Sequence, residues 1–398
     1  MTTTAAGQNL APGRFLFVTW DGGGNVHPAL GLARRLVARG HSVRVLGQRT
    51  LRQRIEAAGA AFRPLPPELE WDASRGRAWE DEGQREYARV LVAGMPMAET
   101  VLAEVDSEPA DVLIVDAFLR SALSAAERTR LPTAALLHVR YRFRNEVKDP
   151  TLRFWDYDPV NEIRHRLGLE PILQDDELLA FKLWQRCNRI LAVVPKEFED
   201  FEGPLPRNLR YVGPVFEGDD ERRALHLPWP PDHLEPLVVV AFSTTYMYHE
   251  RAVTRVLAAL ASLPVRVLFT PGGGLEPGTV ALPPSVVVRP YVSHAMLFPH
   301  ATLVVTHAGM GTFASGVPML CMPFGRDQTG NAAKVEALNA GKSIAPDASI
   351  EEIRSAVEAI LSSDNLRAGA RRIAEVVAGY RRRDLATEEL EGLLTISR

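Results

Sequence analysis

Residues 14–47, RFLFVTWDGGGNVHPALGLARRLVARGHSVRVLG, contain a complete strand–helix–strand unit. Residues 14–19 form a short apolar run that leads into a glycine cluster, and apolar side chains then recur three or four positions apart up to Gly40. A second apolar run follows at residues 42–46. Because both runs are apolar throughout, they are typical of strands that are buried on both faces of a parallel sheet. The stretch therefore predicts an α/β fold with an open parallel sheet.

The same alternation of apolar runs and amphipathic segments continues along both halves of the chain. Further strands are expected at residues 111–115, 133–138, 189–194, 237–242, 266–270, 286–289, 302–306 and 319–322, and helices at 51–58, 121–128 and 250–263. Residues 201–237 are rich in proline, glycine and charge, as linkers between domains are. We expect a first domain at residues 1–210, a linker at 211–236, a second domain at 237–378 and a helical tail at 379–398.

The composition is that of a globular protein and argues against several classes of function. With 398 residues, the chain exceeds the roughly 250–300 residues of a single core, so two domains with a cleft between them are expected. A formal net charge of −3 supplies no basic face for nucleic acid. Cys187 and Cys321 lie far apart and form neither a metal-binding pair nor a disulfide framework. Since no stretch is apolar enough for a signal peptide or a membrane span, we expect a cytoplasmic protein.

Two glycine-rich turns are expected at the carboxyl ends of strands, where doubly wound sheets bind their ligands. The first turn, residues 20–28 (WDGGGNVHP), lacks the G-x-G-x-x-G spacing of dinucleotide sites. The strand at 42–46 is also followed by no acidic residue that could bind a ribose hydroxyl. Both features argue against a redox enzyme of the Rossmann type. A tight connection without a ligand is the structural alternative for the three glycines.

The second turn, residues 306–312 (THAGMGT), carries groups that bind anions. His307 can donate a hydrogen bond, and the residues after it, Gly309, Gly311 and Thr312, let backbone N–H groups at a helix N-terminus approach phosphate oxygens. Residues 326–328 (RDQ) follow the strand at 319–322 and bring hydroxyl acceptors to the same edge of the sheet. A diphosphate site beside hydroxyl acceptors indicates a nucleotide sugar as the ligand.

Residues 304–335, VVTHAGMGTFASGVPMLCMPFGRDQTGNAAKV, resemble the donor-site signature of the family-1 glycosyltransferases, which include bacterial natural-product glycosyltransferases. NLRYVGP at 208–214 and AFSTT at 241–245 are further matches. The resemblance implies the GT-B fold, in which two Rossmann-like, doubly wound domains face each other across a cleft and a C-terminal helix crosses back. It also implies a nucleotide-sugar donor in the second domain and an acceptor in the first.

The donor-binding residues that the resemblance implies come from four segments of the second half. They are Ser243, Thr244, His307, Gly309, Gly311 and Thr312 for the diphosphate, Tyr291 and Val292 for the nucleobase, Asp327 and Gln328 for the sugar hydroxyls, and Asn331 as a support for that loop.

One departure from the family pattern concerns the ribose. In plant relatives an acidic residue eight positions after the signature histidine binds the ribose hydroxyls, whereas Ser315 stands there in this chain. The Gly-Val-Pro at residues 316–318 also begins only nine positions after His307, so about one helical turn of the family pattern is missing. The departure favours a dTDP-activated deoxysugar over a UDP sugar.

A second departure concerns the catalytic base. Where the family has a histidine, three positions before Pro28, this chain has Asn25, and an amide accepts no proton at neutral pH. Asp116 matches the aspartate that orients the histidine and could act directly, while His27 could supply the missing imidazole. We weigh these two equally and keep His138 as a third candidate. A capping or supporting role is the alternative for each.

The expected reaction is the inverting transfer of a sugar from a dTDP- or UDP-sugar to a hydroxyl of a polyketide, macrolide, enediyne or aromatic acceptor. We expect no metal, because the DxD at residues 156–158 lies in an irregular stretch. The acceptor side would comprise Trp20, Gly23, Gly24 and His138, and the aromatic residues of the variable regions are Trp71, Trp79, Phe143, Phe154 and Trp155.

Two other functions stay open at this point. The chain could be a catalytically silent GT-B protein that binds a partner or a ligand, because the histidine base is missing and the donor helix is short. It could also be a nucleotide-sugar epimerase, although that reaction would require carboxylates around the sugar. The expected partners are a nucleotide sugar and a lipophilic small molecule, without nucleic acid or membrane, and a homodimer is one alternative for the assembly.

Overall fold

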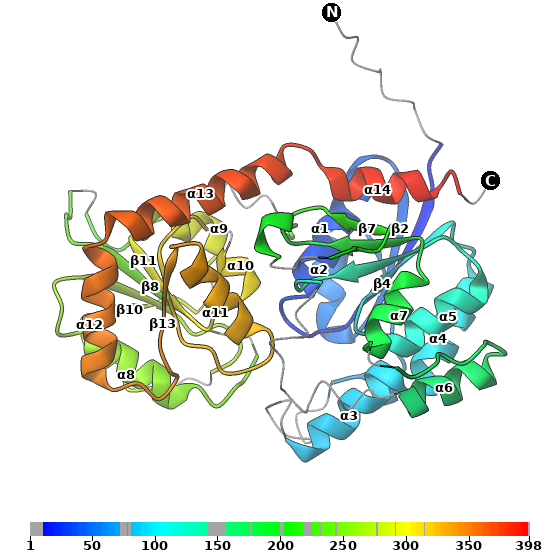
Figure 1. Cartoon of the computed structure of the whole chain (residues 1–398), viewed down its shortest axis with the longest axis horizontal. Coiled ribbons are helices and arrows are strands. Elements are labelled where there is room, and N and C mark those ends of the chain that lie inside the picture. Colours follow the sequence, from blue (N-terminus) through cyan, green and yellow to red (C-terminus); the bar gives the residue numbers. More distant parts are fainter. Residues whose placement is uncertain are drawn as a thin grey trace, which may run out of the picture.

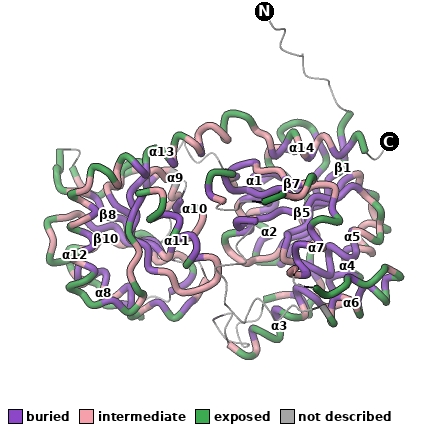
Figure 2. The backbone as a smooth tube through the Cα atoms, in the orientation of Figure 1, coloured by how far each residue is buried: buried purple, intermediate pink, exposed green. Residues whose placement is uncertain are grey.

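A computed structural model describes residues 11–71, 78, 81–141, 157–175, 177–199, 203–218, 225–230, 232–242, 245–275, 278–290, 292–313 and 315–396 of the chain. It shows two α/β bodies side by side, each built around one parallel sheet (Figure 1). The central strands of both sheets are buried, and the exposed residues gather mainly on the outer helices, turns and edge strands (Figure 2). Among the described residues, none of the helices combines the length and apolarity needed to cross a bilayer.

The first sheet has seven parallel strands in the order β3-β2-β1-β4-β5-β6-β7. The strands are β1 Arg14–Val18, β2 Ser42–Gly47, β3 Ala61–Pro64, β4 Val112–Asp116, β5 Thr133–Leu137, β6 Arg189–Ala192 and β7 Leu209–Tyr211. Its helices are α1 Val26–Ala38, α2 Arg52–Ala57, α3 Glu82–Ala93, α4 Met95–Ser107, α5 Arg120–Thr129, α6 Tyr157–Arg166 and α7 Leu179–Gln185. Alternate residues of β1 face opposite layers, since Leu16 packs with α3 to α7 and Phe17 packs with α1 and α2.

The second sheet has six parallel strands in the order β10-β9-β8-β11-β12-β13. The strands are β8 Leu237–Ala241, β9 Arg266–Thr270, β10 Val286–Val288, β11 Leu303–Thr306, β12 Met319–Cys321 and β13 Gly341–Ser343. The helices are α8 Glu250–Leu260, α9 His294–Leu297, α10 Met310–Phe313, α11 Gln328–Ala337, α12 Ile350–Leu361, α13 Asp364–Arg381 and α14 Leu385–Leu393. Short 3-10 helices are η1 Arg49–Leu51, η2 Pro67–Leu69, η6 Lys196–Phe198 and η8 Phe298–His300.

Both sheets reverse their strand order next to their first strand, between β1 and β4 and between β8 and β11. Such reversals leave a crevice at the carboxyl ends of the strands, which is where doubly wound sheets bind ligands. The expected α/β class and two doubly wound sheets are therefore confirmed. The strand order alone therefore indicates where a ligand would bind, at the carboxyl ends of β1 and β4 and of β8 and β11.

The last two helices join the two bodies (Figure 1). Helix α13 runs from the second body towards the first, and α14 lies on the first sheet, where Leu390 packs in the same apolar cluster as Phe17. The turn between them is held by Asp384, whose carboxylate accepts hydrogen bonds from Arg35 at 2.8 Å and from Arg39 at 2.7 Å. The C-terminal helix thus crosses back, as the resemblance implied.

Some short elements do not show in the apolar pattern. Strand β7 lies inside the proline-rich segment at 201–237, and β13 consists of only three residues, Gly-Lys-Ser. Both are edge strands with a single neighbour, so they carry little apolar signal. The division of the chain into residues 1–210, 211–236, 237–378 and 379–398 remains a proposal, and its last boundary would fall inside α13.

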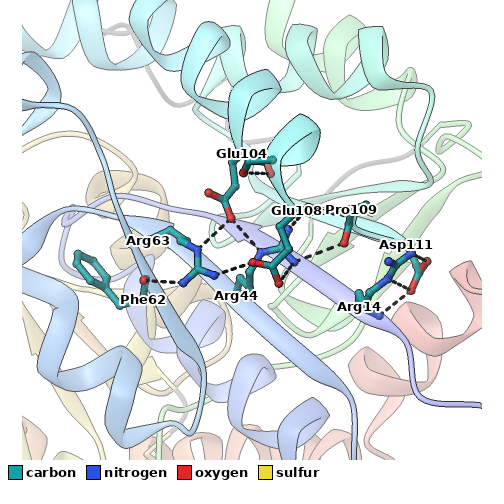
Figure 3. Close-up of polar contacts among 9 residues, drawn as sticks. Arg14, Arg44, Phe62, Arg63, Glu104, Glu108, Pro109 and Asp111 are labelled. Carbon is teal, nitrogen blue, oxygen red and sulfur yellow. Dashed lines mark hydrogen bonds and ion pairs between the residues drawn. The ribbon is translucent and has the colours of Figure 1, made fainter.

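A buried arginine ties β2 to the helix layer at the end of the first sheet that lies away from the turns (Figure 3). The guanidinium of Arg44, only 2% exposed, contacts the carboxylate oxygens of Glu104 and Glu108 at 2.9 Å each. Arg63 on β3 contacts the same two carboxylates at 3.3 and 2.7 Å. A buried charge needs such partners, because taking it out of water alone costs several kcal/mol.

We predict that Arg44→Met lowers the free energy of unfolding by about 2–3 kcal/mol, since it leaves Glu104 largely buried beside only one remaining arginine. Arg14→Met is the matched control. Arg14 pairs with Asp111 at 2.7 Å but is 48% exposed, and its loss should cost less than about 1 kcal/mol. Urea midpoints of the two variants test this, and equal losses would contradict it.

Candidate active site

A cavity of about 390 Å³ lies between the two bodies, at the carboxyl ends of the central strands of both sheets. The first body contributes Trp20 and Phe118, from the turns after β1 and β4. The second body contributes His307 from the turn after β11 and Asp327 from the loop after β12. The two glycine-rich turns predicted from the sequence therefore face one common space.

The imidazole of His307 lies over Gly309. A β-carbon on Gly309 would stand 2.7 Å from Nε2 of His307, so the ring fits only because residue 309 has no side chain. The other nitrogen of this ring, Nδ1, is buried and has no hydrogen-bond partner among the described residues. Ala308 between them has a φ of +68°, a conformation that L-residues rarely adopt outside functional turns. This constrained turn therefore contains a buried imidazole nitrogen, Nδ1 of His307, that has no hydrogen-bond partner among the described residues.

Burial, and to a smaller extent the neighbouring groups His249, Arg326 and His294, lower the pKa of His307 to about 3. Burial and the charge of His27 likewise lower the pKa of His294 to about 4. Both rings are therefore neutral at pH 7. Each can donate one hydrogen bond, but neither carries a charge or accepts protons readily.

Asn331 links the His307 turn to the loop after β12. Its amide nitrogen donates to the carbonyl of Ala308 at 3.0 Å and to Oδ2 of Asp327 at 2.9 Å. Gln328 is buried, and its carboxamide accepts from Phe324 N–H at 2.8 Å and contacts the sulfur of Met247 at 3.2 Å. Of the predicted sugar-binding pair, Asp327 is the residue with the more accessible polar atoms.

Several predicted donor residues are not placed at the cavity. Ser243, Thr244 and Tyr291 lie outside the described residues. Val292 packs against the apolar cluster around Leu237 and does not line the cavity. The polar side chains that the second body adds to the cavity lining, beyond those with an assigned role, are Thr245, His294 and Arg326. Arg326 could have been found from the RDQ motif, while nothing in the sequence marks the other two.

On the first body, Asn25 and Asp116 form a buried pair. The amide nitrogen of Asn25 donates to Oδ2 of Asp116 at 2.8 Å and to the carbonyl of Trp20 at 2.9 Å. The second oxygen of Asp116 accepts from the backbone N–H of Phe118 at 2.9 Å. Asn25 is 2% and Asp116 3% exposed, and neither lines the cavity. Asn25 is therefore a hydrogen-bond donor to Asp116, and neither side chain reaches the cavity lining.

His27 lies at the cavity and contacts a carboxylate. Its Nδ1 is 3.2 Å from Oε2 of Glu217, which also accepts from Arg54 at 3.0 Å. Burial would raise the pKa of Glu217, but the hydrogen bonds from His27 and Arg54 outweigh it and lower the pKa to about 2. The imidazole of His27 is 43% exposed. His27 thus contacts the ionised carboxylate of Glu217, which lies in the segment between the two sheets.

His138 follows β5 and lines the cavity with its ring edge-on to Phe118, at a centroid distance of 4.9 Å. Its Nδ1 is buried without a hydrogen-bond partner and lies 3.8 Å from Oδ2 of Asp116. Of the glycines of the first turn, Gly24 lines the cavity and Gly23 does not. Residues 20, 24 and 138 of the expected acceptor side therefore share one wall.

The aromatic residues expected at the acceptor are mostly not described. Trp79, Phe143, Phe154 and Trp155 lie outside the described residues, as does Asp156 of the DxD. Trp71 packs edge-on against Tyr87 and does not line the cavity. The apolar part of this wall instead comes from residues without a motif: Pro28, Ala88, Val92, Phe118, Val139 and Val193.

The sequence is similar to a known protein family and to characterised relatives. Residues 254–383 match the C-terminal domain of the erythromycin biosynthesis protein CIII-like family. The 4'-demethylrebeccamycin synthase of Lentzea aerocolonigenes is 28% identical, over 96% of this chain and 99% of the relative. The demethyllactenocin mycarosyltransferase of Streptomyces fradiae is 26% identical, over 94% of this chain and 84% of the relative.

Solved structures share the whole architecture. The glycosyltransferase of kitacinnamycin superposes with a TM-score of 0.75 at 21% identity, covering 96% of this chain and 99% of that one. The glycosyltransferase VinC, solved in complex with dTDP, superposes with a TM-score of 0.67 at 18% identity, covering 96% and 99%. At these identities the likeness shows the fold, which is GT-B.

We predict that Glu217→Gln destabilises the protein at pH 7 by about 1–3 kcal/mol. The pKa of Glu217 falls from 4.5 to about 2 on folding, so the ionised form is stabilised above pH 4.5. That stabilisation is lost as the pH falls towards 2, and the difference between variant and parent should shrink over this range. Melting temperatures at pH 7 and pH 3.5 measure it.

Glu56→Gln is the control for this experiment, because Glu56 is 52% exposed and pairs only with Arg52 one helical turn away. It should shift stability by less than about 0.5 kcal/mol. A Glu217 variant whose deficit stays constant down to pH 3.5 would show that the carboxylate charge is not what stabilises this contact.

Proposed function

Because the chain belongs to the GT-B natural-product glycosyltransferases, which take their sugar from a nucleotide donor, we propose that it transfers a deoxysugar from a dTDP-sugar to a hydroxyl of a lipophilic natural product, with inversion at the sugar. One observation carries the proposal. Among the described residues, one cavity is lined by the glycine-rich His307 turn on one side and by several apolar side chains of the first body on the other.

The His307 turn supports a diphosphate site. A neutral histidine with an unpartnered, buried nitrogen is suited to donate to an oxygen anion, and Gly311 beside it leaves open space at the start of α10. Arg326 lines the same wall and is within hydrogen-bond distance of Thr245 at 3.3 Å. We assign the positive charge that the leaving diphosphate needs to Arg326, because His307 carries none.

The short helix after this turn supports dTDP over UDP. Helix α10 spans only Met310–Phe313, and Ser315 stands where plant relatives have the acid that binds ribose hydroxyls. A site without that carboxylate has little to gain from a 2′-hydroxyl. The similar fold of VinC, solved with dTDP, is consistent with this choice.

The opposite wall supports a lipophilic acceptor. Its lining includes Ala88, Val92 and Phe118 from the first body, which present carbon to the cavity. Pockets of this kind bury apolar ligands and fix them with a few polar groups. We propose a polyketide, macrolide, enediyne or aromatic aglycone; the names of the matching family and relatives refer to the natural products erythromycin, demethylrebeccamycin and demethyllactenocin.

The reaction is a direct displacement. An acceptor oxygen forms its bond to the anomeric carbon while the bond from that carbon to the diphosphate oxygen breaks, and the nucleoside diphosphate leaves with the electron pair. The two walls hold both reactants in one cavity, which replaces a bimolecular encounter by a positioned one. His307 and Arg326 stabilise the charge that develops on the leaving oxygen.

A catalytically silent GT-B protein is the second candidate, and one observation favours it: Asn25 replaces the family's base. Such a protein would bind the nucleotide but transfer no sugar. The constrained His307–Gly309 contact suits nucleotide binding in both candidates, so sugar transfer is the property that separates them.

We predict that dTDP and dUDP bind the protein more tightly than UDP does. Without a carboxylate for the ribose, the 2′-hydroxyl gains no partner in the site, so both deoxy nucleotides should bind at least about fivefold more tightly, or roughly 1 kcal/mol. Titration calorimetry with the three nucleotides measures this. Tighter binding of UDP than of dUDP would count against the donor assignment, and no binding of any would remove it.

We also predict that Gly309→Ala weakens dTDP binding tenfold or more, because the new β-carbon displaces the imidazole of His307. Gly392→Ala is the matched control, since a β-carbon there meets no atom within 4 Å and α14 lies on the outer side of the first sheet. The control should bind dTDP as the parent does. Unchanged binding by the Gly309 variant would mean that His307 makes no contact with the diphosphate.

A further inference from the structure

We infer that His138 is the base that deprotonates the acceptor hydroxyl, and that Asp116 and Asn25 position it. The inference rests on the proposed transfer reaction and names the residue that replaces the missing imidazole at position 25. It starts from the groups that line the cavity and from their contacts with Asp116.

The cavity offers few groups that could accept a proton. Among the described residues, Asp327 is the only carboxylate in its lining, and it belongs to the donor wall. Four histidines line the cavity: His27, His138, His294 and His307. The last two lie on the second body with a pKa of about 4 and 3, so they are weak bases. His27 and His138 remain.

Asp116 cannot act on the acceptor directly. It is 3% exposed, does not line the cavity, and uses one carboxylate oxygen for the N–H of Phe118 and the other for Asn25. Its position does suit another task. The oxygen that accepts from Asn25 at 2.8 Å also lies 3.8 Å from Nδ1 of His138.

His138 presents its two nitrogens to two different surroundings. Nδ1 is buried, has no hydrogen-bond partner and faces Asp116, whereas the ring itself lines the cavity. Nε2 is therefore the nitrogen on the cavity side. Catalytic hydrogen bonds are often long in an unliganded enzyme and shorten when substrate binds. A shift of about 1 Å would let Nδ1–H donate to Asp116 and leave the lone pair of Nε2 free to act as the base.

His27 is placed for a different role. It contacts Glu217 of the segment between the sheets, and the ring is 43% exposed. Glu217 already accepts from Arg54, so its charge is shared with a cation. His138 instead packs on Phe118 within the acceptor wall, beside Asp116, whose hydrogen-bond donors among the described residues are Asn25 and Phe118 and include no arginine or lysine.

The proton and the electron pairs then balance. Nε2 of His138 takes the proton of the acceptor hydroxyl as its oxygen bonds to the anomeric carbon, and the diphosphate leaves with the electrons of the broken bond. The resulting imidazolium is stabilised by the carboxyl group of Asp116, which is held in place by the amide of Asn25. Asn25 thus serves as a donor to Asp116 from the position where the family has its base.

The test compares acceptors that need a base with acceptors that do not. With dTDP-glucose as the probe donor, 2-(1-naphthyl)ethanol must lose a proton in the reaction, whereas 4-methylumbelliferone at pH 9 is already ionised. We expect His138→Gln to lower transfer to the alcohol by a factor of roughly 10²–10⁴ and transfer to the phenolate less than about tenfold. A role in structure alone would lower both alike and would overturn the inference.

Three further variants sharpen the comparison. His165→Gln, an exposed histidine on α6, should change neither rate. His27→Gln should affect the two acceptors equally, and a selective loss with the alcohol would assign the base to His27 instead. Asn25→His in the His138→Gln background returns an imidazole to Asp116 and should recover transfer to the alcohol by tenfold or more.

A measurement without turnover separates this inference from the proposed function. In ¹⁵N spectra of the histidine side chains, His138 should be the tautomer with its proton on Nδ1, and Asp116→Asn should change its imidazole shifts more than those of His27. Protonation on Nε2 would overturn the assignment of the base. A parent protein that transfers glucose to neither acceptor and fails to bind dTDP would refute the proposed function, and the spectra would still decide the role of His138.

Discussion

The hydrogen bond from Asn25 to Asp116 joins the ends of the two central strands of the first sheet, and the acceptor wall is arranged around it. The two residues are 91 positions apart in sequence and meet because β1 and β4 are neighbouring parallel strands at the point where the strand order reverses. Asp116 also accepts from Phe118 N–H, which fixes the aromatic ring against which His138 packs. One carboxylate therefore positions both an apolar and a titratable part of the wall.

The second wall, for which we propose a diphosphate ligand, carries little fixed charge. Burial keeps His307 and His294 neutral, so among the described residues Arg326 is the cationic side chain that the second body contributes to the cavity lining. The two walls are held at their distance by α13 and α14, whose junction Asp384 pairs with Arg35 and Arg39 of the first body. A further contact joins the two bodies, since the hydroxyl of Tyr248 donates to Asp81 at the start of α3. The charged groups of these contacts are few and paired nearby, which agrees with the small formal net charge of the chain, −3.

The sequence predicts the strands and turns that carry strong patterns, and it predicts the position of the cavity from topology. The His307 turn, Asp327 and the Asn25 position all follow from motifs at strand ends. Strand β7 and the apolar lining at Ala88 and Val92 do not, because edge strands have a single neighbour and the lining comes from helices whose apolar faces look like any core face. The dependence of His138 on Asp116 is also absent from the sequence, since it requires the ends of β4 and β5 to be adjacent. A residue pair of this kind is visible only once the register of the strands is known.

That register also explains how an enzyme of this family can function with an amide at position 25. In a parallel sheet the strand end at β4 has neighbours on both sides, β1 and β5, so Asp116 can be approached by a donor from either one. Asn25 approaches it from the side of β1 and His138 from the side of β5, both towards Oδ2. An imidazole can therefore reach Asp116 from the turn after β1 or from the end of β5. The absence of a histidine at position 25, after β1, removes one of these two possible bases and leaves Asp116, which orients the base, in place. The amide of Asn25 keeps that side chain in place, because an alanine there would remove its 2.8 Å donor and leave a buried acceptor with one hydrogen bond fewer.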